Sequence, residues 1–473
     1  MKFLILIFGF TLCFSTMKAT VWQVGASRQY TKPSQVSSLV KSNDTVSIDA
    51  GIYTADVAHW TASNLLLQGV GGMAHLKSEG QSWGKKAIWV IGGENTRVAF
   101  IEFSECTVPD GNGAGIRLEA ANLTVHGCYF HDNEDGILAG DNQSSDIVIE
   151  YCEFSHNGKG DGLSHNLYIN HVRSLTFQYN YSHHAKIGHE LKSRAHTNYI
   201  LYNRISNETD GTASREIDLP NGGLAVIMGN EIQQGIESEN SNIIGYGQEG
   251  LTNPTSHQLY IVNNTIVNER GAGSFLTVKD GTAECYAHNN IFAGTGTVIL
   301  GSPIVLDTSH NWNGTIAAAN FVDSKTYNYS LLQTSPAVNR GEGIVKKVND
   351  FSLIPTNEYR HPANLTFRIT KGAIDIGAHE NTSSLSVEES KALPTSFVYP
   401  NPTSGNCTIT IPEILKDNPT IEIFDVTGKQ LKCYENVSGS ITVDVSQFPT
   451  SGIYWVKMSA GFISQNQQLI INK

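Results

Sequence analysis

Short segments in which apolar and polar residues alternate recur through the middle of the chain, and an Asn or a Cys marks each of them. The segments 125–130 (VHGCYF) and 149–154 (IEYCEF) show the pattern. Alternation with a period of two is typical of a strand with one buried face. The marked positions are Cys128, Cys152, Asn180, Asn203, Asn230, Asn264, Asn289 and Asn311, separated by 24, 28, 23, 27, 34, 25 and 22 residues.

A repeat with a period in the twenties that consists of short strands and turns predicts a solenoid. A leucine-rich repeat would need Leu at fixed offsets, and these segments lack them. We therefore predict an all-β chain built as a parallel β-helix, in which each coil contributes two or three short strands. We expect the repeated Asn to adopt the left-handed backbone of a corner and to form a hydrogen-bonded ladder from coil to coil.

The chain outside the repeat divides into distinct segments. Residues 1–19 have a positive start, an apolar run and small residues before a cut after Ala19, which predicts a signal peptide. We assign residues 20–380 to the β-helix, with a short capping helix at about 33–41. Residues 381–397 form a polar linker. Residues 398–473 return to alternation with turn residues, which predicts a small β-sandwich.

Composition and charge exclude several classes of structure and one class of partner. Only 16% of the residues are charged and 44 are Gly, which argues against a helical bundle. The hydrophobic share of 40% argues against disorder. Because the formal net charge is −12, we do not expect nucleic acid as a partner. A polyanionic substrate would need a local basic patch.

The cysteine spacing follows the repeat. Cys106, Cys128 and Cys152 lie 22 and 24 residues apart. An exported protein can form disulfides, so these residues are either packed thiols of neighbouring coils or include a bridge between two of them. The sequence leaves both readings open.

One face of the predicted solenoid carries an unusual density of charge. In the segment 188–194, placing Leu191 and Ser193 inward turns the alternate residues outward. Neighbouring coils stack about 4.8 Å apart, so outward residues of successive coils form one patch. We predict that this patch contains Tyr168, Asn170, Glu190, Lys192, Arg194, Glu216, Asp218 and Lys279.

Histidine is concentrated in the same part of the chain. Six of the sixteen His residues lie between 165 and 196, among them His171 and His189. No pair of His on one element has a spacing that indicates a zinc site. The alternative to a functional site is a solvated face on which opposite charges alternate.

Several segments make the chain similar to known families. The beginning (30–53), the repeat and the segments 335–338 and 375–380 resemble the right-handed parallel β-helix proteins related to pectate lyase and other polysaccharide lyases. The phrases in 399–405, 421–429 and 452–457 resemble the C-terminal sorting domain of the type IX secretion system of Bacteroidota. This resemblance implies passage across the outer membrane to the cell surface or outside, with the secretion machinery as a partner. A carbohydrate-binding module is the rival reading of residues 398–473.

The phrase Lys192-Ser193 followed by Asn198 resembles the neighbourhood of the catalytic lysine in β-helical alginate lyases and chondroitinase B. The resemblance implies that Lys192 is the general base of a β-elimination on a uronic-acid polysaccharide. The Arg that completes the site in those lyases is absent, and Arg215 or His189 would take its place. Arg194, Tyr168, Asn170, His171 and Lys279 would bind the substrate. A Ca²⁺ ion held by Glu190, Glu216 or Asp218 would neutralise the substrate carboxylate.

Other functions remain open at this point. A β-helical glycoside hydrolase would use a carboxylate pair, Glu216 or Asp218 with Glu190. A C5-epimerase shares the proton abstraction of the lyase, and a glycan-binding surface protein would need no catalytic group. We expect a monomer.

Overall fold

The computed structural model describes residues 19–254, 256–381, 397–411, 419–425, 430–435, 437–448, 451–460 and 463–471. The predicted signal peptide and most of the predicted linker lie outside these residues. The chain divides between Ser383 and Ser384 into two compact units.

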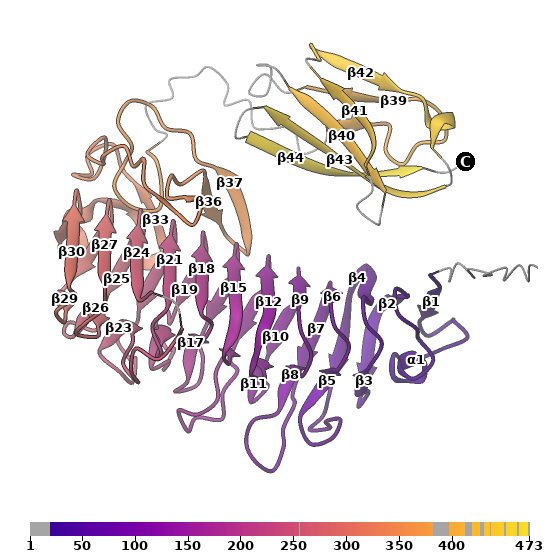
Figure 1. Ribbon diagram of the computed structural model, residues 1–473, viewed down its shortest axis with the longest axis horizontal. Coiled ribbons are helices and arrows are strands. Elements are labelled where there is room, and N and C mark those ends of the chain that lie inside the picture. The colour runs from indigo at the N-terminus through magenta and orange to yellow at the C-terminus, as the bar shows by residue number, and fades with distance from the viewer. Residues whose placement is uncertain are drawn as a thin grey trace, which may run out of the picture. The chain divides into compact units, whose positions relative to one another are not determined.

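The first unit is a parallel β-helix, as the repeat predicts (Figure 1). Each coil contributes strands to three faces. Face 1 is a ten-stranded parallel sheet formed by β3 (Ala58–Trp60), β5 (Ala87–Ile91), β8 (Ala114–Leu118), β11 (Asp135–Ala139), β14 (Leu167–Ile169), β17 (His189–Ser193), β20 (Arg215–Leu219), β23 (Asn242–Tyr246), β26 (Ser274–Val278) and β29 (Thr297–Leu300).

A twenty-one-stranded sheet supplies the other two faces, because its long strands β2 and β4 pass through both. Face 2 contains β1 (Val21–Val24), β2 (Thr45–Thr54), β4 (Leu66–Lys77), β6 (Thr96–Ala99), β9 (Leu123–His126), β12 (Asn142–Glu150), β15 (Val172–Gln178), β18 (Thr197–Leu201), β21 (Leu224–Met228), β24 (Gln258–Val262), β27 (Glu284–His288) and β30 (Val305–Ser309). Face 3 contains the ends of β2 and β4 with β7 (Ile101–Ser104), β10 (Tyr129–His131), β13 (Glu153–Ser155), β16 (Tyr181–His183), β19 (Arg204–Ser206), β22 (Glu231–Gln234), β25 (Thr265–Asn268), β28 (Ile291–Gly294) and β31 (Trp312–Gly314).

Inward side chains of the three faces stack into one core. Phe130 lies between Phe103 and Phe154 with ring centroids 4.9 Å apart on each side and nearly parallel planes. The helix α1 (Ser34–Ser37) lies within the predicted capping segment and buries Val36.

The corner between faces 2 and 3 contains the predicted ladder. It has two residues in successive coils: 179–180, 202–203, 229–230, 263–264 and 289–290. The second residue of each corner is a buried Asn whose side-chain amide donates to the Asn of the next coil. These bonds join Asn180 to Asn203 (3.2 Å), Asn203 to Asn230 (2.9 Å), Asn230 to Asn264 (2.9 Å), Asn264 to Asn290 (3.0 Å) and Asn290 to Asn311 (3.0 Å).

Two details of the ladder differ from the prediction. Asn290, not Asn289, continues it. The left-handed backbone belongs to the residue before each ladder Asn, as at Tyr202 (φ 54°) and Asn289 (φ 57°). The ladder Asn is therefore selected by its hydrogen bonds and not by its backbone conformation.

Cysteines extend the ladder toward the N-terminus. The backbone N–H of Cys152 donates to Asn180 Oδ1 (2.9 Å), and that of Cys128 donates to Cys152 Sγ (3.4 Å). Cys106, Cys128 and Cys152 are buried free thiols, so the packed-thiol reading is correct.

The segment after the last coil folds back on the outer sides of faces 2 and 3. Its apolar residues, such as Leu353 and Tyr329, pack against those two faces. The buried side chains of Arg368 and Glu380 form an ion pair within this segment. The segment comprises three hairpins with two 3-10 turns: η1 (Ala317–Ala319), β32 (Phe321–Asp323), η2 (Ser324–Thr326), β33 (Asn328–Leu331), β34 (Lys347–Val348), β35 (Phe351–Ser352), β36 (Asn357–Arg360) and β37 (Asn364–Phe367).

The second unit contains two antiparallel sheets that enclose their own core, which includes Ile423, Val456 and Leu469. The sheets agree with the β-sandwich prediction. They are formed by β38 (Val398–Tyr399), β39 (Cys407–Thr410) and β42 (Ser440–Val443), and by β40 (Thr420–Asp425), β41 (Gln430–Glu435), β43 (Gly452–Ala460) and β44 (Ile463–Ile471), with η4 (Val445–Gln447) after β42.

Candidate active site

The outer side of face 1 brings together residues of three successive coils. Tyr168 on β14 pairs in register with Lys192 on β17, and Lys192 pairs with Asp218 on β20. These three positions are the stacked row that the alternation predicts. The row therefore places an ammonium group between a phenol and a carboxylate.

Ion pairs connect this row to its neighbours. Lys192 Nζ lies 3.8 Å from Asp218 Oδ2, and Arg215 Nη1 lies 3.0 Å from Asp218 Oδ1. Burial raises the pKa of Asp218, although the charges of Arg215 and Lys192 oppose the shift. Asp218 thus positions Lys192 and Arg215 next to each other.

Glu249 completes the cluster from the loop after β23. One of its carboxylate oxygens lies 3.5 Å from Lys192 Nζ and the other 2.7 Å from Arg194 Nη1. The hydrogen bond from Arg194 lowers the pKa of the Glu249 carboxyl. The Glu249 side chain is 48% exposed, whereas Lys192 and Arg194 are each 14% exposed. An exposed carboxylate therefore occupies the position between the two cations.

Tyr168 supports both cations from the preceding coil. Arg194 Nε donates to its hydroxyl at 3.0 Å, and Lys192 Nζ lies 5.6 Å from the centre of its ring. Arg194 Nη1 also donates to Asn221 Oδ1 at 2.5 Å. A cation over an aromatic face is attracted by the ring's quadrupole, so Tyr168 orients the cationic side chains.

Two histidines stack beside the cluster. The rings of His165 and His189 lie 4.8 Å apart and almost parallel, and His189 Nε2 lies 3.5 Å from Asp218 Oδ2. Burial, reinforced by Lys192 and Arg194, lowers the pKa of His165 to about 3. Burial also lowers the pKa of His189 well below its usual value, with further contributions from His165 and Lys192. Both imidazoles are therefore neutral at neutral pH.

The prediction that Glu190 and Glu216 face outward is wrong. Both side chains are completely buried. Strands of face 1 turn two consecutive residues inward, as Ile243 and Ile244 show, so simple alternation fails there. Glu190 and Glu216 lie one residue before Leu191 and Ile217 and therefore point into the core.

The buried carboxyls differ in their partners. Glu190 accepts hydrogen bonds from the Ala185 backbone, Ser182 and Asn166, yet burial raises its pKa to about 8. Glu216 accepts from Asn207 Nδ2 at 3.3 Å, and burial raises its pKa well above the usual value. Burial therefore favours the uncharged form of both carboxyls, and Asp218 is engaged by Arg215. These residues do not fit the predicted Ca²⁺ site, which needs accessible ionised oxygens.

We expect Glu216→Gln to make stability less sensitive to a rise in pH above about 4.5. Below the ordinary pKa of 4.5 the carboxyl is protonated in the folded and the unfolded chain, whereas above it only the unfolded chain ionises. The folded wild type thus loses about 1.4 kcal/mol per pH unit up to its raised pKa, and the amide removes this loss. The melting temperature of wild type and variant should be compared from pH 4 to 9, with exposed Glu94→Gln as the control. Parallel profiles would contradict an uncharged Glu216.

The remaining predicted residues lie at the margin of the cluster. Asn170 Oδ1 accepts from the backbone N–H of His171, and His171 Nδ1 lies 3.7 Å from Asp141. Lys279 follows Val278 of β26, three coils beyond Lys192. It is therefore separated from Lys192 by roughly 14 Å along the solenoid axis.

Sequence reasoning missed His165, Asn221 and Glu249. His165 belongs to the dense histidine segment, but its register was not assigned. Glu249 lies within the gap of 34 residues between Asn230 and Asn264, which exceeds every other gap between marked positions. An unusually long gap indicates a loop insertion, and this loop reaches the cluster.

Two family models match parts of the chain. Residues 50–238 match the family model for the right handed beta helix region, and residues 397–472 match that for the secretion system C-terminal sorting domain. No curated protein matches the chain. Among solved structures, pectin methylesterase PemA from Erwinia chrysanthemi is similar at 14% identity and a TM-score of 0.30, over 47% of this chain and 81% of that chain.

The first unit is thus a right-handed parallel β-helix. The second is a sorting domain, and the protein is exported through the type IX secretion system to the cell surface or outside. In the part of the chain that the structure describes, no helix has the length and apolar character of a membrane span.

Proposed function

We propose that the protein is a polysaccharide lyase that cleaves a uronic-acid-containing polymer by β-elimination on face 1. The observation that carries this proposal is the cluster in which Lys192 and Arg194 flank one exposed carboxylate, with Tyr168 and neutral His189 beside them. A uronate presents such a carboxylate next to the carbon whose proton is removed. Glu249 therefore marks the position that the substrate carboxylate would take.

The elimination assigns a role to each group. Arg194 pairs with the substrate carboxylate and so stabilises the negative charge that develops when the C5–H bond breaks. Lys192, as the free amine, takes this proton. The released electron pair forms the C4–C5 double bond while the C4–O bond breaks. Neutral His189 is the proposed proton donor to the leaving oxygen, and Arg215 holds Asp218 in place beside Lys192.

The hydrolase alternative loses support from the burial of its carboxylate pair. Glu190 and Glu216 are inside the core, so neither can face a glycosidic bond on the surface. An epimerase would use the same Lys192 but would leave the chain length of the polymer unchanged.

The proposal is tested by incubating the mature protein with a panel of uronate polysaccharides and following the ultraviolet absorbance of the unsaturated product. A rise in absorbance together with chain shortening supports the lyase. New reducing ends without absorbance would indicate hydrolysis, and a change in uronate configuration without cleavage would indicate epimerisation. Binding with no reaction on every polymer would contradict an enzymatic role.

We expect Glu249→Gln to lower KM for the polymer by about two- to fivefold. The substrate carboxylate must displace the Glu249 carboxylate from Lys192 and Arg194, and an exposed ion pair of this kind is worth at most about 1 kcal/mol. Initial rates over a range of polymer concentrations measure the effect. Glu239→Gln, which removes an exposed carboxylate on another loop, is the control. A raised KM would show instead that Glu249 helps to bind substrate.

A further inference from the structure

A second cluster of polar side chains lies on face 3, on strands of three successive coils. His75 comes from β4, Glu102 from β7 and His131 from β10. His75 pairs in register with Glu102, and His131 pairs with Ser104, two residues further along β7. One potential ligand atom of each of the three side chains lies within 4.8 Å of the other two. None of these residues belongs to the cluster around Lys192.

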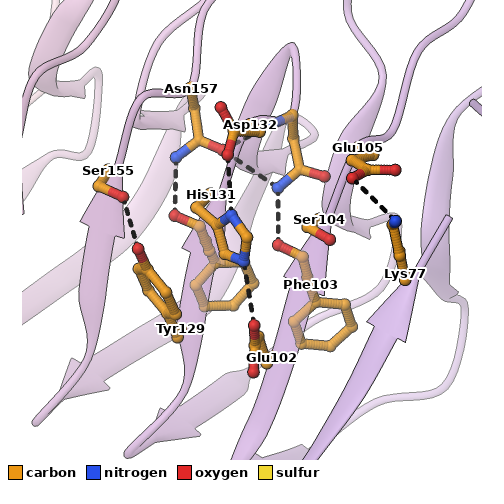
Figure 2. Close-up of polar contacts among 12 residues, drawn as sticks. Lys77, Glu102, Phe103, Ser104, Glu105, Tyr129, His131, Asp132, Ser155 and Asn157 are labelled. Carbon is orange, nitrogen blue, oxygen red and sulfur yellow. Dashed lines mark hydrogen bonds and ion pairs between the residues drawn. The ribbon is translucent and has the colours of Figure 1, made fainter. Parts of the chain in front are cut away.

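The three side chains converge on one point. His131 Nε2 lies 3.1 Å and His75 Nδ1 lies 3.4 Å from the same oxygen, Glu102 Oε1. The ring centres of His75 and His131 are 5.8 Å apart. Figure 2 shows His131 between Glu102 and Asp132. Two imidazole nitrogens and a carboxylate oxygen therefore face a common space.

Outer partners hold both imidazoles in this orientation. His131 Nδ1 lies 2.9 Å from Asp132 Oδ2, and His75 Nε2 lies 2.7 Å from Ser104 Oγ. The ring of Tyr129 stacks on His131 at 4.4 Å. In metal sites the second nitrogen of a ligating His characteristically bonds to a carboxylate or another polar group, which fixes the ring.

The charges around His131 also favour a cation beside its ring. Each of its two ring nitrogens faces a carboxylate oxygen, Asp132 on one side and Glu102 on the other. A neutral imidazole has a single N–H and can satisfy only one of them. Either a second proton or a cation must stand between His131 and Glu102.

We propose that His75, Glu102 and His131 bind a divalent transition-metal ion, with Zn²⁺ as the best match. Two imidazoles and one carboxylate are a ligand set that Zn²⁺ accepts, and water would take the fourth position. The three side chains are 18–25% exposed, so an ion can enter from solvent. The proposal is independent of the lyase activity.

The test is a calorimetric titration of Zn²⁺ into the untagged, chelator-treated mature protein at neutral pH. We expect one ion per chain and a melting temperature that rises with Zn²⁺ concentration. Asp132→Asn should weaken binding by about 10- to 100-fold, because it alters the outer partner of His131 and leaves all three ligands in place. His131→Ala and Glu102→Gln should weaken binding more than Asp132→Asn does. Co²⁺ substituted for Zn²⁺ should give visible absorption bands that both ligand variants lose.

His126→Ala is the matched control. His126 Nδ1 lies 3.1 Å from Glu150 Oε1, so this pair resembles half of the proposed site without the second imidazole. The control should bind Zn²⁺ like wild type. Absence of binding by wild type, or equal affinity in wild type and Glu102→Gln, would overturn the proposal. Glu102→Gln retains the side-chain shape, and its melting temperature without metal shows that it is folded.

Discussion

Replacing Lys192 with Ala is expected to lower the elimination rate by about 10³-fold or more. The substitution removes the proposed base, and positioned acid–base groups contribute about 10² to 10⁴ to rates. Lys192 also joins Asp218 to Glu249, so its loss disturbs the charge pattern of the site. The initial rate of ultraviolet absorbance, at polymer concentrations above KM, is the measurement. The loss should appear in kcat, because Arg194 remains to bind the substrate carboxylate.

Two companion variants separate catalysis from charge. Lys192→Arg keeps the positive charge but cannot supply a free amine, so it should be nearly as inactive as Lys192→Ala. Lys86→Ala removes a lysine that is ion-paired with Glu119 at another place on the solenoid, and it should retain wild-type rates. Full activity of Lys192→Arg would refute the assignment of Lys192 as the base.

Replacing Asn203 with Ala is expected to destabilise the β-helix by about 3–5 kcal/mol. Asn203 is fully buried, and its amide donates to Phe177 O and to Asn230 Oδ1, both at 2.9 Å. Its own oxygen accepts from the backbone and side chain of Asn180. The Ala variant would leave the Asn180 backbone N–H unpaired in the core, which costs about 1–3 kcal/mol. It would also remove the side-chain hydrogen bonds to Phe177, Asn180 and Asn230, each worth about 0.5–1.5 kcal/mol.

Thermal and denaturant-induced unfolding measure this effect. Asn313→Ala is the control, because Asn313 also lies on a strand of the solenoid but is exposed. It should change stability by less than about 0.5 kcal/mol. A loss below about 1 kcal/mol for Asn203→Ala would mean that the coils do not depend on the ladder.

Much of the fold could be predicted from the sequence because the coils of the β-helix repeat the same strand alternation and the same corner. The spacing of Asn180, Asn203 and Asn230 reflects a corner that contains two residues in every coil from β9–β10 to β30–β31, so the period survives in the sequence. The alternation also placed Tyr168, Lys192 and Asp218 in one row, which the register confirms. Local periodicity was sufficient wherever the backbone remained regular.

The same reasoning failed where the backbone departs from alternation. Glu190 and Glu216 were expected to face outward because strict alternation does not allow two consecutive inward residues. Glu249 was missed because it comes from a loop whose path the repeat does not determine. His75, Glu102 and His131 form no local sequence motif, because they lie on three successive coils. Such a group is visible only when the coils are aligned in register.

The corner between faces 2 and 3 keeps two residues in every coil from β9–β10 to β30–β31. The other two corners, which border face 1 on both sides, contain different numbers of residues: two between β14 and β15 but eleven between β23 and β24. Evolution can therefore lengthen or shorten the loops at the edges of the charged surface without interrupting the ladder. A lineage could change which polymer it recognises by exchanging loops such as the one that carries Glu249, while the stacked scaffold stays the same.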